Sequence, residues 1–103
     1  MKDLDKELFE ACGKGNIEEI ESLIKKGADV NAKEYYNWTA LMLASENGHT
    51  KIVKLLIDNG ADVNAVNSYL ETALFLSVKK KDIEMIRILI DAGADIEGYI
   101  GDI

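Results

Sequence analysis

A six-residue segment that returns at a constant offset of 33 residues constrains the fold of this chain more than any other feature. Gly27–Ala32 recurs as Gly60–Ala65, and Gly93–Glu97 repeats its first five positions with conservative changes. Leucines keep the same register, at Leu8, Leu41 and Leu74. A fixed period of this length is typical of one supersecondary unit that buries its apolar face only against copies of itself. The sequence therefore predicts a stack of three units.

The stack is expected to form a single domain. The period runs without an insertion, and the chain of 103 residues has no Pro, so no linker divides it. We expect one domain over residues 1–103, with repeats at about residues 4–33, 34–66 and 67–99. A chain of this length has room for one hydrophobic core and no second domain.

Each unit is expected to contain two helices, and the second unit shows them most clearly. Thr39–Glu46 is typical of a short helix, because the Thr hydroxyl can cap its first amides and Gly48 follows its end. A second helix is predicted from about His49 to Asp58, apolar on most of its circumference, as a helix packed on both sides should be. Gly60 ends it in the left-handed conformation. The chain then extends and turns before the next helix.

Several groups of residues in this layout resemble the ankyrin repeat family, whose unit has the same length. They are Thr39-Ala40-Leu41, Ala44, Gly48-His49, Ile52-Val53, Leu55-Leu56 and Gly60–Ala65. The resemblance covers nearly the whole chain. It implies an all-α solenoid, an ankyrin repeat stack of helix-turn-helix units with short β-hairpin fingers.

The sequence departs from the family at a few positions. Ala40 and Ala73 stand where the family usually has Pro at the start of the first helix. Leu70, and more mildly Asn37, occupy the hairpin position where the family prefers Gly. Pro at a helix start and Gly at a left-handed turn mainly add stability, so we expect lower local stability and an unchanged fold.

The residue pattern predicts no catalytic, metal or cofactor site. The single histidine, His49, has Asn16 and Asp82 as register mates, and all three residue types can cap the second helix of their unit. Cys12 aligns with one small and one apolar residue, which favours a buried thiol. A catalytic or metal-binding histidine and a reactive cysteine are the opposing interpretations, and both lack the neighbouring groups that they need. We expect no enzymatic activity and no cofactor.

The net charge and the cysteine content limit which partners and which cellular compartment are expected. The 12 Lys+Arg and 19 Asp+Glu give a net charge of −7, which repels phosphate backbones and anionic lipids. Neither nucleic acid nor a membrane is therefore expected as a partner. The longest apolar run, Ala40–Ala44, is far below the roughly 20 residues of a spanning helix, and Met1–Glu10 lacks the apolar stretch of a secretory signal. The unpaired Cys12 fits a reducing compartment, so we expect a cytoplasmic protein.

The only basic run is Lys79-Lys80-Lys81. It falls where the first helix of the third unit should end, and lysines there complement the helix dipole. We interpret the run as a solvated helix end. Contact with a partner is the alternative, because this end borders the concave face in the family.

Aromatic residues gather in the expected fingers. Tyr35, Tyr36, Trp38 and Tyr69 all lie there, out of seven aromatic residues in the chain. Half-exposed Tyr and Trp are typical of binding hot spots, because they offer a large contact area at low entropic cost. The alternative is that each ring covers the neighbouring finger and only supports stacking. For Trp38 and Tyr69 the two interpretations are equally supported, whereas Tyr35 and Tyr36 at the finger tip favour binding.

These observations predict a non-catalytic protein-protein interaction module. In the ankyrin family partners dock on the finger tips and the concave helix face, and another protein or peptide is therefore the expected partner. The matching positions are Lys33, Tyr35, Tyr36, Trp38, Glu46, Asn47, Ser68, Tyr69, Glu71, Lys79 and Lys80. The alternative is a structural or assembly segment of a longer or self-associating ankyrin solenoid.

The two ends of the stack differ in polarity. Glu19 and Ser22 of the first unit correspond to apolar residues in the later units, so this unit is expected to form a polar cap. The third unit keeps apolar residues at these positions, Met85 and Ile88. We therefore expect an apolar face on the third repeat, with Met85 and Ile88 exposed on it. Three outcomes are therefore expected as alternatives: the tail from Glu97 to Ile103 folds back over this helix, the face pairs with another chain, or the natural protein continues beyond Ile103. The second alternative is the predicted self-association through the C-terminal repeat.

Overall fold

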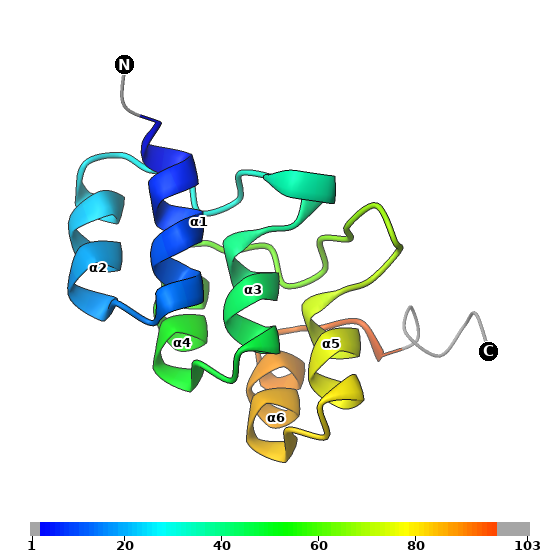
Figure 1. Cartoon of the computed structure of the whole chain (residues 1–103). Helices are drawn as coiled ribbons and strands as arrows, with labels where there is room; N and C mark the ends of the chain where they lie inside the picture. The colour runs from blue at the N-terminus through cyan, green and yellow to red at the C-terminus, as the bar shows by residue number, and fades with distance from the viewer. Residues whose placement is uncertain (1–2, 97–103) are drawn as a thin grey trace.

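Three antiparallel helix pairs make up the chain, one pair in each 33-residue unit. The structure is a computed structural model, and it describes residues 3–96. The first helices of the three units are α1 (Leu4–Lys14), α3 (Ala40–Glu46) and α5 (Ala73–Lys79). The second helices are α2 (Ile17–Lys25), α4 (Thr50–Asp58) and α6 (Ile83–Asp91). Figure 1 shows α1, α3 and α5 side by side in one row, each backed by the second helix of its unit.

Polar side chains start most of the helices, as the sequence predicted. The Thr39 and Thr72 hydroxyls accept the amide hydrogens of the third helical residues of α3 and α5, at 3.3 and 3.1 Å. Asn16 and Asp82 cap α2 and α6 in the same way, each at 3.1 Å. His49 stands at the matching position of α4, but its side chain makes no capping hydrogen bond. The capping role is therefore confirmed for two of the three register mates.

The turn inside each helix pair requires one left-handed residue. Gly15 and Gly48 hold this place in the first two units, with φ of 78° and 72°. Lys81 holds it in the third unit with φ 59°, although a residue with a Cβ is disfavoured there. The Lys79–Lys81 run is thus a helix end and the turn that follows it, with Lys80 as the C-terminal cap of α5.

The core runs the length of the stack between the two rows of helices. The register leucines Leu8, Leu41 and Leu74 are all buried, with 1%, 1% and 2% of their surface exposed. Ile20 and Val53, register mates on the second helices, are fully buried. Each unit buries these residues against its neighbour, so the three-unit stack predicted from the period is confirmed.

Two asparagines join the units beneath the fingers. Asn31 Nδ2 donates to the Gly60 carbonyl at 2.9 Å, and its Oδ1 accepts the Asp62 amide hydrogen at 2.7 Å. Asn64 repeats both contacts one unit further on, with Gly93 and Asp95, at 3.1 and 2.7 Å. The repeated GADVNA segment therefore has a structural role in coupling each unit to the next.

The fingers differ from the expected β-hairpins. The first finger (Glu34–Trp38) contains a single short 3-10 turn, η1 (Tyr35–Asn37), the second finger (Asn67–Glu71) is a loop, and no strand occurs within residues 3–96. One backbone hydrogen bond closes each loop, Glu34 N–H to the Trp38 carbonyl at 2.8 Å and Asn67 N–H to the Glu71 carbonyl at 3.0 Å. Tyr36, Asn37 and Leu70 have left-handed backbone conformations, which turn the chain tightly. Within the described residues, the two sides of each finger are therefore not paired as β-strands. The all-helical repeat solenoid is confirmed, with loops in place of paired strands.

The apolar end of the third repeat differs from the predicted one. Met85 is fully buried and Ile88 is half-buried, because this side of α6 packs toward the preceding unit. Glu19, the register mate of Met85, and Ser22, the register mate of Ile88, are both exposed on α2, as expected for a polar cap. The tail from Glu97 to Ile103, one of the expected covers of the third repeat, lies outside the described residues. The exposed apolar residues at the C-terminal end are Ile83 at 66%, Ile90 at 38% and Ile96 at 44%.

Candidate protein-binding surface

The two fingers are tied to each other. The Ser68 amide donates to the Tyr36 carbonyl oxygen at 2.8 Å, and Asn37 Nδ2 donates to the Ser68 hydroxyl at 3.2 Å. Lys33 Nζ reaches the Val66 carbonyl oxygen at 3.5 Å. Because these bonds link residues about one repeat apart, the fingers present one preformed surface (Figure 1).

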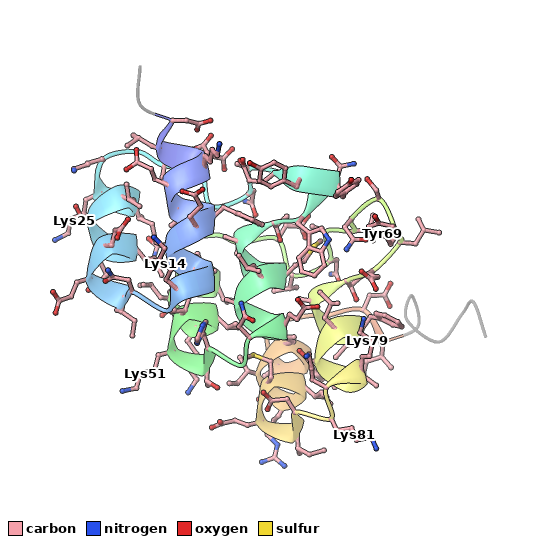
Figure 2. The ribbon with its side chains drawn as sticks, viewed as in Figure 1. Lys14, Lys25, Lys51, Tyr69, Lys79 and Lys81 are labelled. Atoms are coloured by element: carbon pink, nitrogen blue, oxygen red, sulfur yellow. The ribbon has the colours of Figure 1, made fainter. Side chains whose placement is uncertain are left out.

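Exposed aromatic rings lie on this surface. Tyr36 and Tyr69 come from neighbouring fingers, and their ring centroids are 5.8 Å apart with a tilt of 43°. Tyr35, Tyr36 and Tyr69 remain 61%, 67% and 62% exposed. Figure 2 shows Tyr69 at the second finger, well away from Lys81 at the far end of α5. The ring pair therefore stabilises the stacking of the fingers and still offers most of its surface to solvent.

Trp38 occupies a more interior position than the tyrosines. It is half-buried, and its backbone carbonyl closes the first finger. Trp38 therefore exposes less of its side chain than Tyr35, Tyr36 and Tyr69 do.

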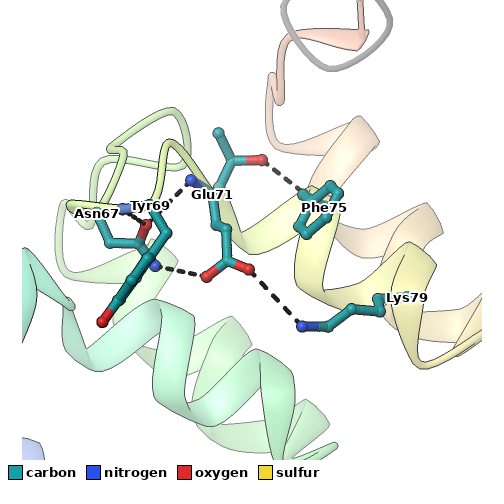
Figure 3. A network of polar contacts seen from close by, with 6 residues as sticks. Asn67, Tyr69, Glu71, Phe75 and Lys79 are labelled. Carbon is teal, nitrogen blue, oxygen red and sulfur yellow. Dashed lines mark hydrogen bonds and ion pairs between the residues drawn. The ribbon is translucent and has the colours of Figure 1, made fainter. Parts of the chain in front are cut away.

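The base of the second finger is a closed polar network (Figure 3). Asn67, only 3% exposed, accepts the amide hydrogens of Tyr69 and Glu71 on its Oδ1, at 2.8 and 3.0 Å. Its Nδ2 donates to Glu71 Oε1 at 2.9 Å, and Glu71 Oε2 lies 3.7 Å from Lys79 Nζ. The Lys79 ammonium also lies over the Phe75 ring, 5.7 Å from its centroid. The charges of Glu71 and Lys79 are thus largely satisfied inside the chain.

The base of the first finger has a different composition. Glu34, half-buried, is the register mate of Asn67, and within residues 3–96 its carboxylate has no hydrogen-bond or ion-pair partner. Burial raises its pKa, and the negative charges of Asp3 and Asp5 on the start of α1 raise it further. The field of Lys6 acts in the opposite direction, but Glu10 adds to the rise. Tyr35 raises the pKa of Lys6, so the side chains of these two residues lie near one another.

The predicted site residues fall into two groups. Lys33, Tyr35, Tyr36, Trp38, Ser68, Tyr69 and Glu71 lie in or beside the fingers, and the structure brings them together. Glu46, Asn47 and Lys80 lie at the opposite ends of α3 and α5, although the Lys79 side chain reaches back to Glu71. Sequence reasoning missed Glu34 and Asn67. Their register, which pairs an acid with an amide at the base of successive fingers, is the signal that could have found them.

Two residues considered for chemistry have structural surroundings. His49 Nε2 lies 3.5 Å from the Gly13 carbonyl, and its ring packs beside Gly15 at the junction of the first two units. Cys12 is fully buried, and burial raises the pKa of its thiol to about 12, so the thiolate form is suppressed. Over the described part of the chain, no three His, Cys, Asp or Glu residues converge as metal ligands would. None of the helices within residues 3–96 combines the length and apolar character that crossing a membrane requires.

Helix pairs stacked in register, with loop fingers on one edge, define a helical repeat solenoid. A family model of ankyrin repeats in three copies matches residues 8–99, so the chain belongs to the ankyrin repeat family.

Individual relatives match shorter segments. Over 43 residues the chain is 49% identical to the mitochondrial disaggregase of Homo sapiens and 46% identical to that of Bos taurus. These matches cover 42% of this chain and 6% of each relative. The probable E3 ubiquitin-protein ligase XBOS33 of Oryza sativa subsp. japonica is 44% identical over 46 residues, which cover 45% of this chain and 9% of that protein. The chain thus spans only a small fraction of the curated relatives it matches.

Proposed function

We propose that this chain is a non-catalytic interaction module that binds another protein through its fingers and the neighbouring face of the first helices. Ankyrin repeats generally mediate protein-protein interaction, which supports this class of function. The observation that carries the proposal is the Tyr36–Tyr69 pair, mostly exposed on two fingers that are already tied together. Rigid exposed rings offer contact area with little entropic cost on binding.

The proposed contact residues are those predicted from the sequence, ranked by where they lie. Tyr35, Tyr36 and Tyr69 are the anchors, with Lys33 and Ser68 beside them. Trp38, which is half-buried, contributes the exposed part of its ring. Glu46, Asn47, Glu71, Lys79 and Lys80 extend the surface along the first helices, where a larger partner would reach them.

A comparative capture experiment tests this function. Wild type, a Tyr36→Ala/Tyr69→Ala variant and an Ile83→Ala control are immobilised and exposed to extract of the native cell, and captured proteins are quantified by mass spectrometry. Ile83 is a suitable control because it is 66% exposed on α6, away from the fingers. We expect a defined set of proteins that the double variant loses and the control retains. An identical set on all three proteins would contradict binding through the fingers.

Assembly through the C-terminal end is a second candidate function, and one observation favours it. Val53 and Val63 of the second unit are 0% and 9% exposed beneath the third unit, whereas their register mates Ile86 and Ile96 are half-buried and 44% exposed. The third unit therefore presents the same apolar positions that its predecessor buries. Sedimentation equilibrium tests this, with an Ile86→Lys/Ile90→Lys variant as the comparison. A monomeric wild type at high concentration would contradict self-association.

The remaining sequence predictions stay proposals. A cytoplasmic location is supported by the lone, reduced and buried Cys12. The net charge of −7 argues against nucleic acid and anionic membranes as partners.

A further inference from the structure

The surface around the first finger combines exposed rings with several carboxylates. Asp3, Asp5 and Glu10 lie near enough to Glu34 for their negative charges to raise its pKa. Asp3 and Asp5 also accept backbone amide hydrogens at the start of α1 and from Asp29, whereas the Glu34 carboxylate has no such partner within residues 3–96. The positive groups nearby are Lys6, whose charge opposes the rise in the Glu34 pKa, and Lys33, which is directed to the Val66 carbonyl oxygen beside the second finger. This side of the finger therefore keeps an excess of negative charge.

The rest of the stack does not balance this excess locally. Lys79, whose ammonium lies at the base of the second finger, is engaged with Glu71 and the Phe75 ring. Lys14, Lys25, Lys51 and Lys81 lie away from the fingers (Figure 2). An approaching ligand at the fingers thus meets three exposed tyrosines, with the acidic groups directly beside Tyr35.

We propose that the surface formed by Glu34, Tyr35, Tyr36 and Tyr69 binds an extended segment of another protein that carries Arg or Lys. The proposal rests on the function proposed above and names the chemistry of the partner. The carboxylate of Glu34 and its acidic neighbours attract the cationic head, and the faces of the tyrosine rings receive it and its aliphatic stem. The rings are preorganised by the bonds between the fingers, so little order has to be created on binding.

Charge complementarity decides between this occupant and a second copy of the chain. Two copies that met at this surface would bring two acidic clusters together, in molecules that each carry a net charge of −7. Like charges placed opposite one another oppose such a complex. A basic segment instead relieves the repulsion among the carboxylates around Glu34.

Selection from a library of random peptides displayed on phage tests the proposal with a defined probe. Peptides that bind wild type are synthesised, and their affinities are measured by fluorescence anisotropy at low and at physiological salt. The variants are Glu34→Gln, Tyr36→Ala and Tyr36→Phe. Glu21→Gln on α2 is the matched control, because it makes the same change in charge at an exposed position far from the fingers. Circular dichroism checks that every variant is folded.

We expect the selected peptides to be enriched in Arg and Lys relative to the library. Glu34→Gln and Tyr36→Ala should each weaken binding by about tenfold or more, as interface anchors do. Tyr36→Phe and Glu21→Gln should bind like wild type, and affinity should fall as salt rises.

Three results would overturn the proposal in distinguishable ways. Peptides without basic enrichment that still lose affinity with Tyr36→Ala would refute the basic partner and leave the binding function of the fingers standing. Peptides whose affinity is unchanged by both Glu34→Gln and Tyr36→Ala would refute the site and, with it, the proposed function of the fingers. Peptides that are basic but bind the Glu21→Gln control as weakly as Glu34→Gln would show attraction by net charge alone and would also overturn the proposal.

Discussion

The two fingers have the same backbone design and different chemistry. Each is a loop closed by one hydrogen bond at its base, with left-handed residues at its turn. In the second finger Asn67 directs its amide group inward and binds the loop's own amides, and Glu71 is paired with Lys79. In the first finger Glu34 stands at the position of Asn67 and faces other carboxylates.

The difference shows how a repeat protein can separate stability from recognition. The second finger uses its polar groups to hold its own shape. The first finger is tied to its neighbour through Ser68, and its Tyr35 and Tyr36 side chains remain mostly exposed. The four predictions below test this comparison, in order of decreasing effect.

The comparison requires that the helices beneath the two fingers be equivalent. Leu41 and Leu74 are register mates that follow the first and second fingers, and both are almost fully buried. Leu41→Ala and Leu74→Ala should each lower the free energy of unfolding by about 2–5 kcal/mol, through lost burial and the cavity that remains. Urea unfolding followed by circular dichroism measures this. A near-neutral result for either variant would mean that the units are not equivalent and that the fingers cannot be compared directly.

Replacing the residue at the base of each finger by Ala should lower the free energy of unfolding much more in the second finger than in the first. Asn67→Ala leaves three hydrogen-bonding partners without their amide in a buried place, and should cost about 2–3 kcal/mol of unfolding free energy. Glu34→Ala removes no hydrogen bond of the described residues and should cost less than about 0.5 kcal/mol. The same urea unfolding experiment applies. Equal losses in the two variants would remove the distinction between the fingers.

Replacing the left-handed turn residues Leu70 and Asn37 by Gly should change the free energy of unfolding by different amounts. Leu70 has φ 62° and is 78% exposed, so its left-handed backbone conformation is unfavourable and little side-chain packing offsets that cost. Leu70→Gly should raise the free energy of unfolding by about 0.5–1 kcal/mol, less than the full left-handed cost because Gly also loses more entropy on folding. Asn37→Gly should change it by only a few tenths, because Asn tolerates this conformation. Thermal unfolding of both variants measures the difference, and a destabilised Leu70→Gly protein would contradict it.

The smallest effect is a dependence on pH at Glu34. The pKa of Glu34 is raised in the folded chain, so its protonated form is favoured there and folding stability is lost as pH rises through that pKa. Glu34→Gln should therefore match wild type at acidic pH and be more stable than wild type at neutral pH, by about 0.2–1 kcal/mol. Glu21→Gln is the matched control, because it makes the same change in charge at an exposed position on α2. A Glu34→Gln protein less stable than wild type at neutral pH would mean that the carboxylate has a stabilising partner.

Repetition explains how much of this fold the sequence could predict. Helix starts at Thr39 and Thr72 and the buried leucines follow from local capping and from a period that three copies report independently. The side on which an apolar residue of the second helix lies was harder to predict. Met85 belongs to the side that faces the preceding unit, and its exposure depends on which neighbour is present.

The candidate surface was predicted less completely, for a related reason. The tyrosines were found because their type and their place in the finger already indicate exposure. Glu34 was missed because its environment is created by Asp3, Asp5 and Glu10 of α1, at least 24 positions earlier in the chain. No property of the residues adjacent to Glu34 in sequence carries that information.

The buried thiol of Cys12 allows the opening of the first repeat to be measured by thiol labelling, without an added probe site. The sequence holds a single cysteine, its side chain is fully buried, and its pKa of about 12 leaves almost no thiolate at neutral pH. A thiol reagent such as a disulfide dye can therefore react only in molecules whose first repeat has separated from its neighbours. The labelling rate at saturating reagent gives the opening rate of that repeat, and the rate at low reagent gives its opening equilibrium. The opening of the N-terminal unit can thus be measured separately from the global unfolding of the stack.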